Sequence, residues 1–407
     1  MTHVMPGRRH PCGGYACWWR VALTVALLLV LTFVAGCGRG GPESAGGARR
    51  GEGGGERPPA TAPPVVLNPL TGLPVDDEAT LRQRPVLVSI DNHPRARPQA
   101  GLTQADLVYE VPAEGGITRL LALFMTARPE RVGPVRSSRH YFLDVAQEWN
   151  AIYVHAGGSP QHYARIRSTG LPDLDGVRGN PRAGGDPIFT RDGHRKAPHN
   201  LYASLQLVQR AAEEQGWSEE AGPVERRFRF EKEPGRLDGQ PAEEVRIDWP
   251  GWSRGWVRYV LRDDGRYERH TAYGPHRAEE TGAVIAPANL LIQFAPAQRI
   301  TGDEAGRLDV DVVGEGRLLI ISGGRAREGR WQKDDPAAPT AWLDEDGGIA
   351  RLLPGPTWVH IVPEETPVEI TPGDAEGGAG AGDGGRAGSQ GGSGDSASVT
   401  GGAGAAR

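Results

Sequence analysis

The sequence predicts a layered α/β domain followed by a smaller, mainly antiparallel β domain, with a disordered segment at each end. Three observations support this. In the first half of the chain, short apolar strands alternate with stretches of helical apolar spacing. In the second half, short strands are separated by turn residues. Residues 38–64 and 373–407 are rich in Gly and have no apolar periodicity, so they cannot form a core.

Composition limits the class of protein. The chain has 407 residues, including 59 Gly and 34 Pro, and its 46 basic and 51 acidic residues give a net charge of −5. That length suits two domains of ordinary size. Because a nucleic-acid binder is usually basic, we expect no nucleic-acid partner.

The N-terminus has the pattern of a secretory signal. Residues 1–20 contain three arginines and no acidic residue, and an apolar run follows over 21–35. This run is too short to span a membrane comfortably. It ends in Val34-Ala35-Gly36-Cys37, which resembles the bacterial lipobox. The resemblance implies that residues 1–36 are removed and that Cys37 is lipidated. The protein would then be anchored to the extracytoplasmic face of the plasma membrane.

The cysteines limit the chemistry of the mature protein. Cys12 and Cys17 lie in the predicted signal peptide, and Cys37 is the predicted lipidation site. No free thiol then remains for catalysis, for a disulfide or for a zinc site. Residues 37–64 are predicted to form a disordered tether, and residues 373–407 a disordered tail. Domains are expected over 65–216 and 224–372.

The first domain is predicted from its strands and helices in chain order. Helical spacing over Phe142–Trp149 indicates a helix that Ser137 or Ser138 can cap. Ser159 followed by Pro160 marks a second helix start, and a third helix is expected over 204–215. Apolar runs predict strands at 85–90, 107–111, 118–125 and 151–155.

The second domain shows alternation typical of half-buried strands. The turn Asp263-Asp264-Gly265 predicts a hairpin between 256–262 and 266–271. Trp331, Trp342 and Trp358 are expected to lie in the core rather than to stack on sugar rings. Further strands are predicted around 228–230, 245–249, 289–294, 308–313 and 317–322.

Long stretches of both domains resemble one family. The strings RPVLVSIDNHPRARPQAGLTQADLVYEVPAEGGITRLLALF, GPVRSSRHYF, HAGGSP and RKAPHNLY cover most of 68–215. They are similar to the YerB-like lipoproteins of Gram-positive bacteria. The string GGRAREGRWQKDDPAAPTAWLDEDGGIARLLPGPTWVHIVP resembles the C-terminal domain of the same family. The family is known as a domain of unknown function, so the resemblance implies no reaction, cofactor or ligand.

Two predicted helix starts are candidate anion sites, because backbone amides and the helix dipole favour negative charge there. Guanidinium groups beside hydroxyls suit phosphate or carboxylate. The alternative is ordinary helix capping with arginines in surface ion pairs. The candidate ligand-binding residues are Gly157, Gly158 and Ser159 at one start and Arg136, Ser137, Ser138 and Arg139 at the other.

Polar side chains also follow several predicted strands. We expect them to face one crevice, because ligands gather at the carboxyl ends of strands in open α/β sheets. Such a set can act as general acid and base or hold a divalent metal, although no dense metal motif is present. The alternative is that turns and backbone hydrogen bonds satisfy them. The residues are Asp91, His93, Glu110, Glu114 and His155. A triad of Ser159, His155 and Asp91 would lack the GxSxG motif of a nucleophile elbow.

A third cluster lies in Arg195-Lys196-Ala197-Pro198-His199-Asn200. The chain has only three lysines, so Lys196 is not background usage. Lys196 and Asn200 are candidate ligand-binding residues, and His199 is a candidate acid or base. The alternative is a solvated loop in which Asn200 makes a local side-chain bond.

Three functions remain open. The leading hypothesis is a membrane-anchored lipoprotein that binds an anionic cell-wall or other envelope ligand, or a partner protein. The second is a hydrolase or transferase that acts on an envelope substrate, using Asp91, Glu110, Glu114, His155 and His199 with or without a metal. The third is a scaffold in which these side chains hold the fold together. The sequence identifies no cofactor and leaves enzyme activity undecided.

Overall fold

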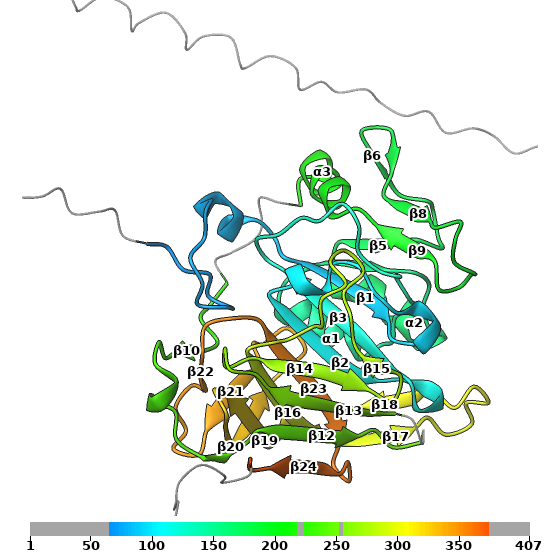
Figure 1. The fold of residues 1–407 in the computed structure, drawn as a ribbon. Coiled ribbons are helices and arrows are strands. Elements are labelled where there is room, and N and C mark those ends of the chain that lie inside the picture. Colours follow the sequence, from blue (N-terminus) through cyan, green and yellow to red (C-terminus); the bar gives the residue numbers. More distant parts are fainter. Residues whose placement is uncertain (1–64, 218–223, 252–254, 374–407) are drawn as a thin grey trace, which may run out of the picture. The chain divides into compact units, whose positions relative to one another are not determined.

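A large mixed sheet organises the described part of the chain (Figure 1). The structure is a computed structural model that describes residues 65–217, 224–251 and 255–373. The predicted signal peptide, Cys37, the tether and all but the first residue of the predicted tail lie outside these ranges.

The large sheet has 11 strands drawn from both halves of the sequence. Its spatial order is β11 (Gln240–Pro241), β20 (Arg325–Lys333), β19 (Gly314–Ser322), β16 (Asn289–Ala295), β23 (Thr357–Pro363), β2 (Leu107–Pro112), β3 (Thr118–Phe124), β1 (Val86–Asp91), β4 (Ile152–His155) and β5 (Asp173–Asp175), and β21 (Ala341–Asp344) pairs with β20.

The pairing directions show where the two halves of the sequence join. Strands β1, β2 and β3 pair in antiparallel fashion, whereas β1, β4 and β5 are parallel neighbours. Strand β2 pairs in parallel with β23, and β23 pairs in parallel with β16. Strand β2, from the first predicted domain, therefore pairs directly with β23, from the second, and one continuous sheet contains strands of both.

A second sheet has five strands that are mutually antiparallel. Its order is β15 (Gly274–Pro275), β14 (Tyr267–Thr271), β13 (Trp256–Leu261), β12 (Glu244–Asp248) and β24 (Val368–Thr371). Two-stranded pairs complete the described strands: β10 (Arg229–Phe230) with β22 (Arg351–Leu352), β17 (Ala297–Arg299) with β18 (Leu308–Val310), β6 (Arg182–Ala183) with β7 (Asp186–Pro187), and β8 (Phe189–Arg191) with β9 (Leu201–Ala203).

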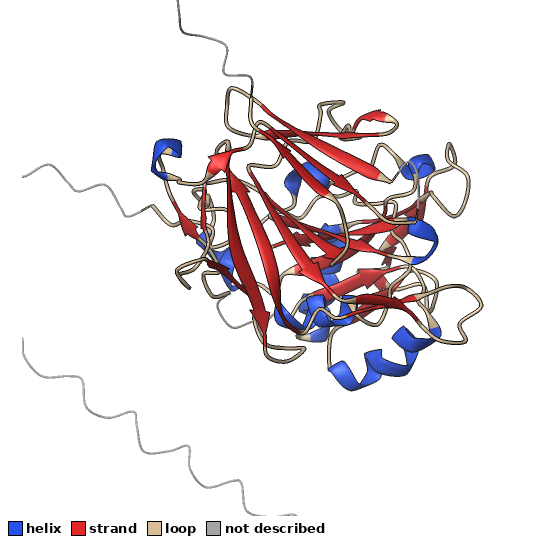
Figure 2. Cartoon of the chain, turned by 90° about the horizontal axis from the view of Figure 1, so that it is seen from below, coloured by secondary structure: helices blue, strands red, loops and turns tan. Residues whose placement is uncertain are grey.

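The helices are short, as Figure 2 shows. Ser159 caps α2 (Pro160–Thr169) as predicted, by accepting from the His162 amide. Ser204, the first residue of the range predicted for the third helix, caps α3 (Leu205–Gln215) by accepting from the Leu207 amide. The α-helices are completed by α1 (Phe142–Glu148). The 3-10 turns are η1 (Glu78–Arg82), η2 (Pro94–Ala96), η3 (Leu102–Gln104), η4 (Glu114–Gly116) and η5 (Pro234–Arg236).

The predicted cap of the first helix is wrong. The residue before α1 is Tyr141, which makes no side-chain cap bond, and the helix begins only at Phe142. Ser137 and Ser138 lie in an extended segment, where Ser138 bridges Gly158 in parallel. Because this backbone pairs with neighbouring segments, neither serine can serve as the N-cap of the helix.

The large sheet is buried on both faces because its central strands carry mostly apolar side chains on each face. Strands β1, β2, β3, β4, β16 and β23 are buried at every position, as expected of strands covered on both sides. One face packs with α3 and the small sheet through residues such as Val208, Ile247 and Tyr259. The other packs with α1 and two tryptophans, Trp331 and Trp342.

The predicted fold class needs correction in the first half. Between β1 and β3 the strands are connected by 3-10 turns rather than by α-helices. The described residues contain more strand than helix. The sheet is mixed and shared, rather than a layered α/β sheet belonging to the first half alone. The division into separate domains at residues 217–223 stays a prediction. The core position of Trp331, Trp342 and Trp358 is confirmed, because each is at most 2% exposed.

A buried ion pair links α1 to the C-terminal half. Lys333 Nζ lies 3.0 Å from Glu148 Oε2, and both side chains are at most 2% exposed. Thr340 and Tyr109 donate hydroxyl hydrogen bonds to the same carboxylate. Burial alone would raise the pKa of Glu148, but Lys333 and Arg227 outweigh it and lower that pKa. Glu148 is therefore ionised in the interior, where it depends on its partners.

We expect Glu148→Gln to lower the free energy of unfolding by about 3–5 kcal/mol, because it leaves the Lys333 charge buried without a counter-charge. Urea denaturation measures this. Glu233→Gln is the matched control, since Glu233 is 70% exposed in its pair with Arg236, and we expect it to change stability by about 0.5 kcal/mol or less. Equal effects of the two substitutions would show that the buried pair is not a stabilising contact.

Candidate functional site

An inserted segment, residues 134–138, separates the carboxyl ends of β1 and β4. The two strands pair in parallel only from Val86 to Val88 on the β1 side. Beyond that point the Arg136 amide donates to the Ser89 carbonyl at 2.8 Å, and the Ala156 amide donates to the Arg136 carbonyl at 3.0 Å. The inserted segment thus brings Arg136 beside Asp91, the last residue of β1.

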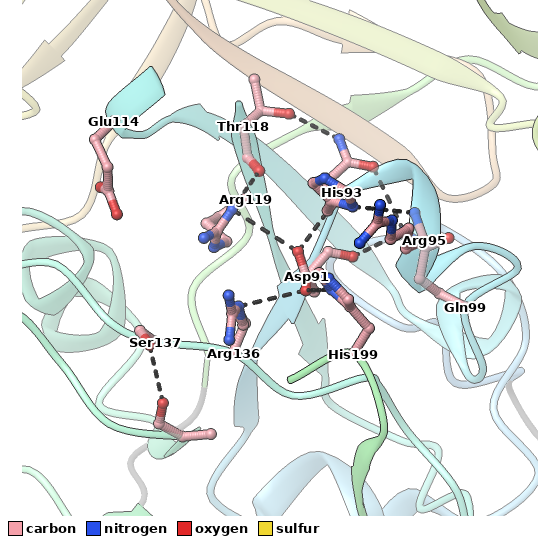
Figure 3. A network of polar contacts seen from close by, with 12 residues as sticks. Asp91, His93, Arg95, Gln99, Glu114, Thr118, Arg119, Arg136, Ser137 and His199 are labelled. Carbon is pink, nitrogen blue, oxygen red and sulfur yellow. Dashed lines mark hydrogen bonds and ion pairs between the residues drawn. The ribbon is translucent and has the colours of Figure 1, made fainter. Parts of the chain in front are cut away.

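Asp91 lies at the centre of a polar group at this sheet end, shown in Figure 3. Its Oδ2 atom lies 2.7 Å from His199 Nδ1 and 3.3 Å from Arg136 Nε. Its Oδ1 atom accepts from the His93 amide at 3.0 Å and lies 3.9 Å from Arg119 Nη1. We call Asp91, His93, Arg119, Arg136 and His199 the Asp91 cluster.

The Asp91 cluster keeps its carboxylate ionised. Burial alone would raise the pKa of Asp91, but Arg119 leads a set of groups that together lower it. The others are the His93 amide, His199 and Arg136. Because the carboxylate accepts hydrogen bonds only, His199 donates through Nδ1.

The two imidazoles of the Asp91 cluster lie in contact. The rings of His93 and His199 stack with centroids 4.7 Å apart. His93 Nδ1 accepts from the Arg95 amide at 3.1 Å, so neutral His93 carries its proton on Nε2. Burial and His199 lower the pKa of His93, which makes it neutral at pH 7. His199 Nε2 has no partner among the described residues, so in the neutral ring it is a free acceptor.

A second ion pair lies beside the Asp91 cluster. Arg139 donates from Nε and Nη2 to the two carboxylate oxygens of Glu114. Burial raises the pKa of Glu114, but Arg139 outweighs it and lowers that pKa. The Arg139 Nη1 atom is occupied as well, since it donates to the Ser138 carbonyl at 2.6 Å. The Asp91 cluster and this ion pair together hold three arginines, Arg119, Arg136 and Arg139, and two carboxylates.

Glu110 does not join the Asp91 cluster. Its Oε2 atom lies 2.9 Å from Arg269 Nη2 and 3.3 Å from His360 Nδ1, and all three side chains are at most 1% exposed. Burial raises the pKa of Glu110, but Arg269 and His360 outweigh it and lower that pKa to about 2. The expectation that Glu110 shares a crevice with Asp91 is wrong, because its carboxylate is enclosed between the two sheets.

His155 does not join the Asp91 cluster either. Its Nε2 atom lies 2.6 Å from Asp173 Oδ1, and its Nδ1 atom lies 2.8 Å from the Gly157 carbonyl. Both ring nitrogens are therefore occupied by groups other than Ser159 and Asp91. The triad of Ser159, His155 and Asp91 is not formed.

The residues around the start of α2 are largely satisfied within the protein. The Gly157 amide donates to Asp175 at 2.8 Å, and the Ser159 amide donates to the Ser138 carbonyl at 3.2 Å. Ser138 also accepts from the Tyr153 hydroxyl at 2.7 Å. Ser137 donates to the Ala156 carbonyl, and Gly158 packs against the His162 ring.

The third predicted cluster has divided roles. His199 belongs to the Asp91 cluster, whereas Lys196 is exposed. The Asn200 amide donates to the carbonyls of Asp192 and Arg195, each at 3.0 Å. Asn200 thus makes the local loop contacts given above as the alternative to ligand binding.

Arg119 and Asp173 were missed by sequence reasoning. Arg119 follows Thr118 at the start of a strand that is otherwise apolar, and the antiparallel register places it opposite Asp91. A charged residue near the start of an apolar strand is the signal that could have identified it. Among the residues that the structure describes, no group of three or more His, Cys, Asp or Glu side chains is placed to hold a metal ion. No helix in the same residues is long and apolar enough to cross a membrane.

Comparison with known proteins identifies the family. Residues 70–218 match the N-terminal domain, and residues 246–359 the C-terminal domain, of a family described as a protein of unknown function (DUF3048). The chain belongs to this family.

Relatives confirm the predicted resemblance. Over 315 residues the chain is 35% identical to the "Putative lipoprotein YerB" of Bacillus subtilis (strain 168), covering 75% of this chain and 89% of the relative. The crystal structure of the Bacillus subtilis YerB protein matches with a TM-score of 0.63 and 32% identity, covering 75% of this chain and 99% of that one.

His162 provides a test of the electrostatics near this sheet end. Its ring is fully buried and neither ring nitrogen has a hydrogen-bond partner. Burial, with His155, lowers the pKa of His162 to about 4 from 6.5. The unfolded chain therefore binds a proton at this position below about pH 6.5, before the folded protein does. Stability from this group is present above pH 6.5 and is lost as the pH falls toward 4.

Lowering the pH from 7 to 5 reduces the free energy of unfolding of the wild type through His162. We expect the reduction to be about 1–2 kcal/mol smaller in the His162→Phe variant. Urea unfolding at the two pH values measures this difference. His194→Phe is the control, because His194 is exposed, and it is expected to follow the wild type. A His162→Phe variant with the full wild-type loss would refute the assignment.

Proposed function

We propose that this protein is a lipoprotein anchored outside the plasma membrane through Cys37, and that it binds an anionic envelope ligand at the Asp91 cluster. The lipobox-like sequence before Cys37 supports the anchor, as does the lipoprotein name of the Bacillus relative. Cys37 itself lies outside the described residues.

The observation that carries the ligand proposal is the free hydrogen-bonding capacity of Arg136. Only its Nε atom contacts Asp91, at 3.3 Å, and its side chain is 26% exposed. Among the described residues nothing accepts a hydrogen bond from its two terminal amino groups. Arg119 Nε is buried without a hydrogen-bond partner. A polar group left without a partner costs free energy, and an anion would supply the missing acceptor.

A phosphate ester fits this arrangement best. A guanidinium with two free amino groups binds a phosphate through parallel hydrogen bonds. The His93 Nε2–H is a further donor near the same carboxylate. Asp91 holds Arg136 and His199 in place and leaves the outer edge of the arginine for the ligand. The proposal rests on the arginines rather than on α2, because the residues at the start of that helix already have partners.

We expect Arg136→Gln to weaken the binding of glycerol phosphate by about tenfold or more, since charge-assisted hydrogen bonds contribute about 1.5–3 kcal/mol each. Isothermal titration calorimetry on the full chain in detergent measures the affinity. Arg167→Gln, at an exposed position of α2, is the matched control and is expected to bind as the wild type does. Equal affinity of all three proteins would remove the Asp91 cluster as the ligand site.

A second function, acid–base hydrolysis of an envelope ester, is supported by the pairing of Asp91 with His199. In this pair Asp91 orients the imidazole and its negative charge stabilises the protonated ring. His199 Nε2 is then placed to accept a proton from water, and Arg136 lies beside the position where negative charge would develop.

Hydrolysis of bis(p-nitrophenyl) phosphate by the full chain tests this second function. If it operates, we expect His199→Asn to lower the turnover rate by about 100-fold or more, because general-base catalysis contributes about 10²–10⁴-fold. Binding of glycerol phosphate by the same variant should persist through Arg136. Wild-type protein that binds the phosphate without hydrolysing the ester supports the first function and rejects the second.

A further inference from the structure

The two histidines of the Asp91 cluster lie in loops that both contact one short segment from the other half of the chain. We call residues 92–99 the His93 loop and residues 192–200 the His199 loop. Both loops lie in the range matched by the N-terminal family domain. The segment that they contact is residues 276–280, which follows β15 and lies in the range matched by the C-terminal family domain.

Gln99 fixes the end of the His93 loop. Its carbonyl accepts from the Glu279 amide at 3.0 Å, and its Nε2 atom donates to the Asp91 carbonyl at 2.9 Å (Figure 3). Its Oε1 atom lies 2.6 Å from His276 Nε2. His276 Nδ1 accepts from Arg269 Nε at 2.9 Å, so the neutral ring carries its proton on Nε2 and donates it to Gln99. Gln99 therefore joins the last residue of β1 to the 276–280 segment.

Glu279 reaches the His199 loop through Arg195. Glu279 Oε2 lies 2.8 Å from Arg195 Nη2. The same guanidinium donates to the carbonyls of Ala96 and Pro98, each at 2.9 Å. Arg195 thus joins three parts of the chain, namely its own His199 loop, the His93 loop and the 276–280 segment. Because a guanidinium is planar and its donors have fixed directions, these contacts set the placement of one loop against the other.

A second arginine joins Glu279 to the His199 loop. Arg131 donates from Nε to Glu279 Oε1 and from Nη2 to Asp192 Oδ2, each at 2.7 Å. The Tyr202 hydroxyl donates to Glu279 Oε2 at 3.1 Å, and the Arg131 guanidinium stacks on the Tyr202 ring. One carboxylate therefore accepts from two arginines and a tyrosine. Its side chain is only 23% exposed, so water screens these contacts in part.

We propose that Glu279 is a positioning residue of the Asp91 cluster, which holds the His199 loop through Arg195 and Arg131 so that His199 can donate to Asp91. This role rests on the proposed function, because it matters only if the cluster acts on a ligand. The charged groups of the cluster all lie in the N-terminal region. The C-terminal region thus completes the site without contributing a side chain to it.

Hydrogen exchange of the full chain in detergent, read by mass spectrometry, tests this role without any ligand. We expect Glu279→Gln to speed amide exchange in the His199 loop by about tenfold, because the loop loses its charged hydrogen bonds. Exchange in β4 should stay as in the wild type. Glu280→Gln is the matched control, since Glu280 accepts from the Gly101 amide and the Thr103 hydroxyl and has no contact with the His199 loop among the described residues.

Reaction with diethyl pyrocarbonate reports on the His199 imidazole itself. We expect Glu279→Gln to speed modification of His199 by about threefold or more, because the ring leaves Asp91 more often when the loop opens. His194 is the internal reference, since it is already exposed in the wild type. Glu279→Asp keeps the negative charge and should restore most of the wild-type protection of His199.

Arg195→Gln breaks the same contact from the other side and keeps the test decisive if Glu279→Gln fails to fold. Faster exchange confined to the His199 loop in either variant supports the positioning role. Exchange that rises equally in β4 and in the His199 loop overturns it, because Glu279 would then stabilise the fold as a whole. Equal results for Glu279→Gln and Glu280→Gln overturn it as well. Failure of the wild type to bind glycerol phosphate would reject the proposed ligand and leave the exchange result standing.

Discussion

Strand β2 lies between β3 and β23, and its parallel pairing with β23 is the contact through which the large sheet passes from the first family region to the second. The register of this pairing places Glu110 opposite His360. It therefore brings a carboxylate of the N-terminal region against the imidazole and arginine of the C-terminal region. The large sheet therefore contains strands of both regions. α3 and the small sheet pack against one face of this shared sheet.

Buried charges mark the places where the two regions meet. Glu110 with Arg269 and Glu148 with Lys333 each join a carboxylate from the first region to a cation from the second. Such pairs add little to stability relative to apolar residues of the same size, but each half is destabilising without the other. They therefore favour the relative placement of the two regions in which each carboxylate meets its cation over placements held by apolar contacts alone. The Asp91 cluster differs from these pairs, because part of the hydrogen-bonding capacity of Arg136 remains available to solvent or a ligand.

The elements that local sequence determines were predictable. The strand at Val86–Asp91 is apolar apart from Ser89 and its last residue, and α2 begins at a proline preceded by a capping serine. The pairing of β2 with β23 was not predictable, because an apolar run indicates that a strand is buried but not which strand lies beside it. For this reason the first half looked like a separate α/β domain.

The same limit applies to the candidate site. Asp91 and His199 were each identified as polar residues at the end of a strand or in a loop, but 108 positions separate them and no spacing rule joins them. His155 looked equivalent to His199 in the sequence, yet the fold gives it Asp173 as its partner. The sequence did not identify Arg119 as a site residue, because its position opposite Asp91 depends on the register between β3 and β1. Residue types were thus predictable, whereas their partners required the tertiary structure.

The inclusion of β23 in the middle of the sheet also has a consequence for biosynthesis. Until residues 357–363 pair with β2, that strand has no neighbour on one side, and its backbone amides and carbonyls form an exposed edge. Pairings between such distant parts of a chain form slowly, and open edges promote association between nascent molecules. A chain cut short anywhere before β23 would carry this open edge permanently. Quality control that recognises unpaired strands would therefore detect truncated copies of this protein even when their N-terminal region is intact.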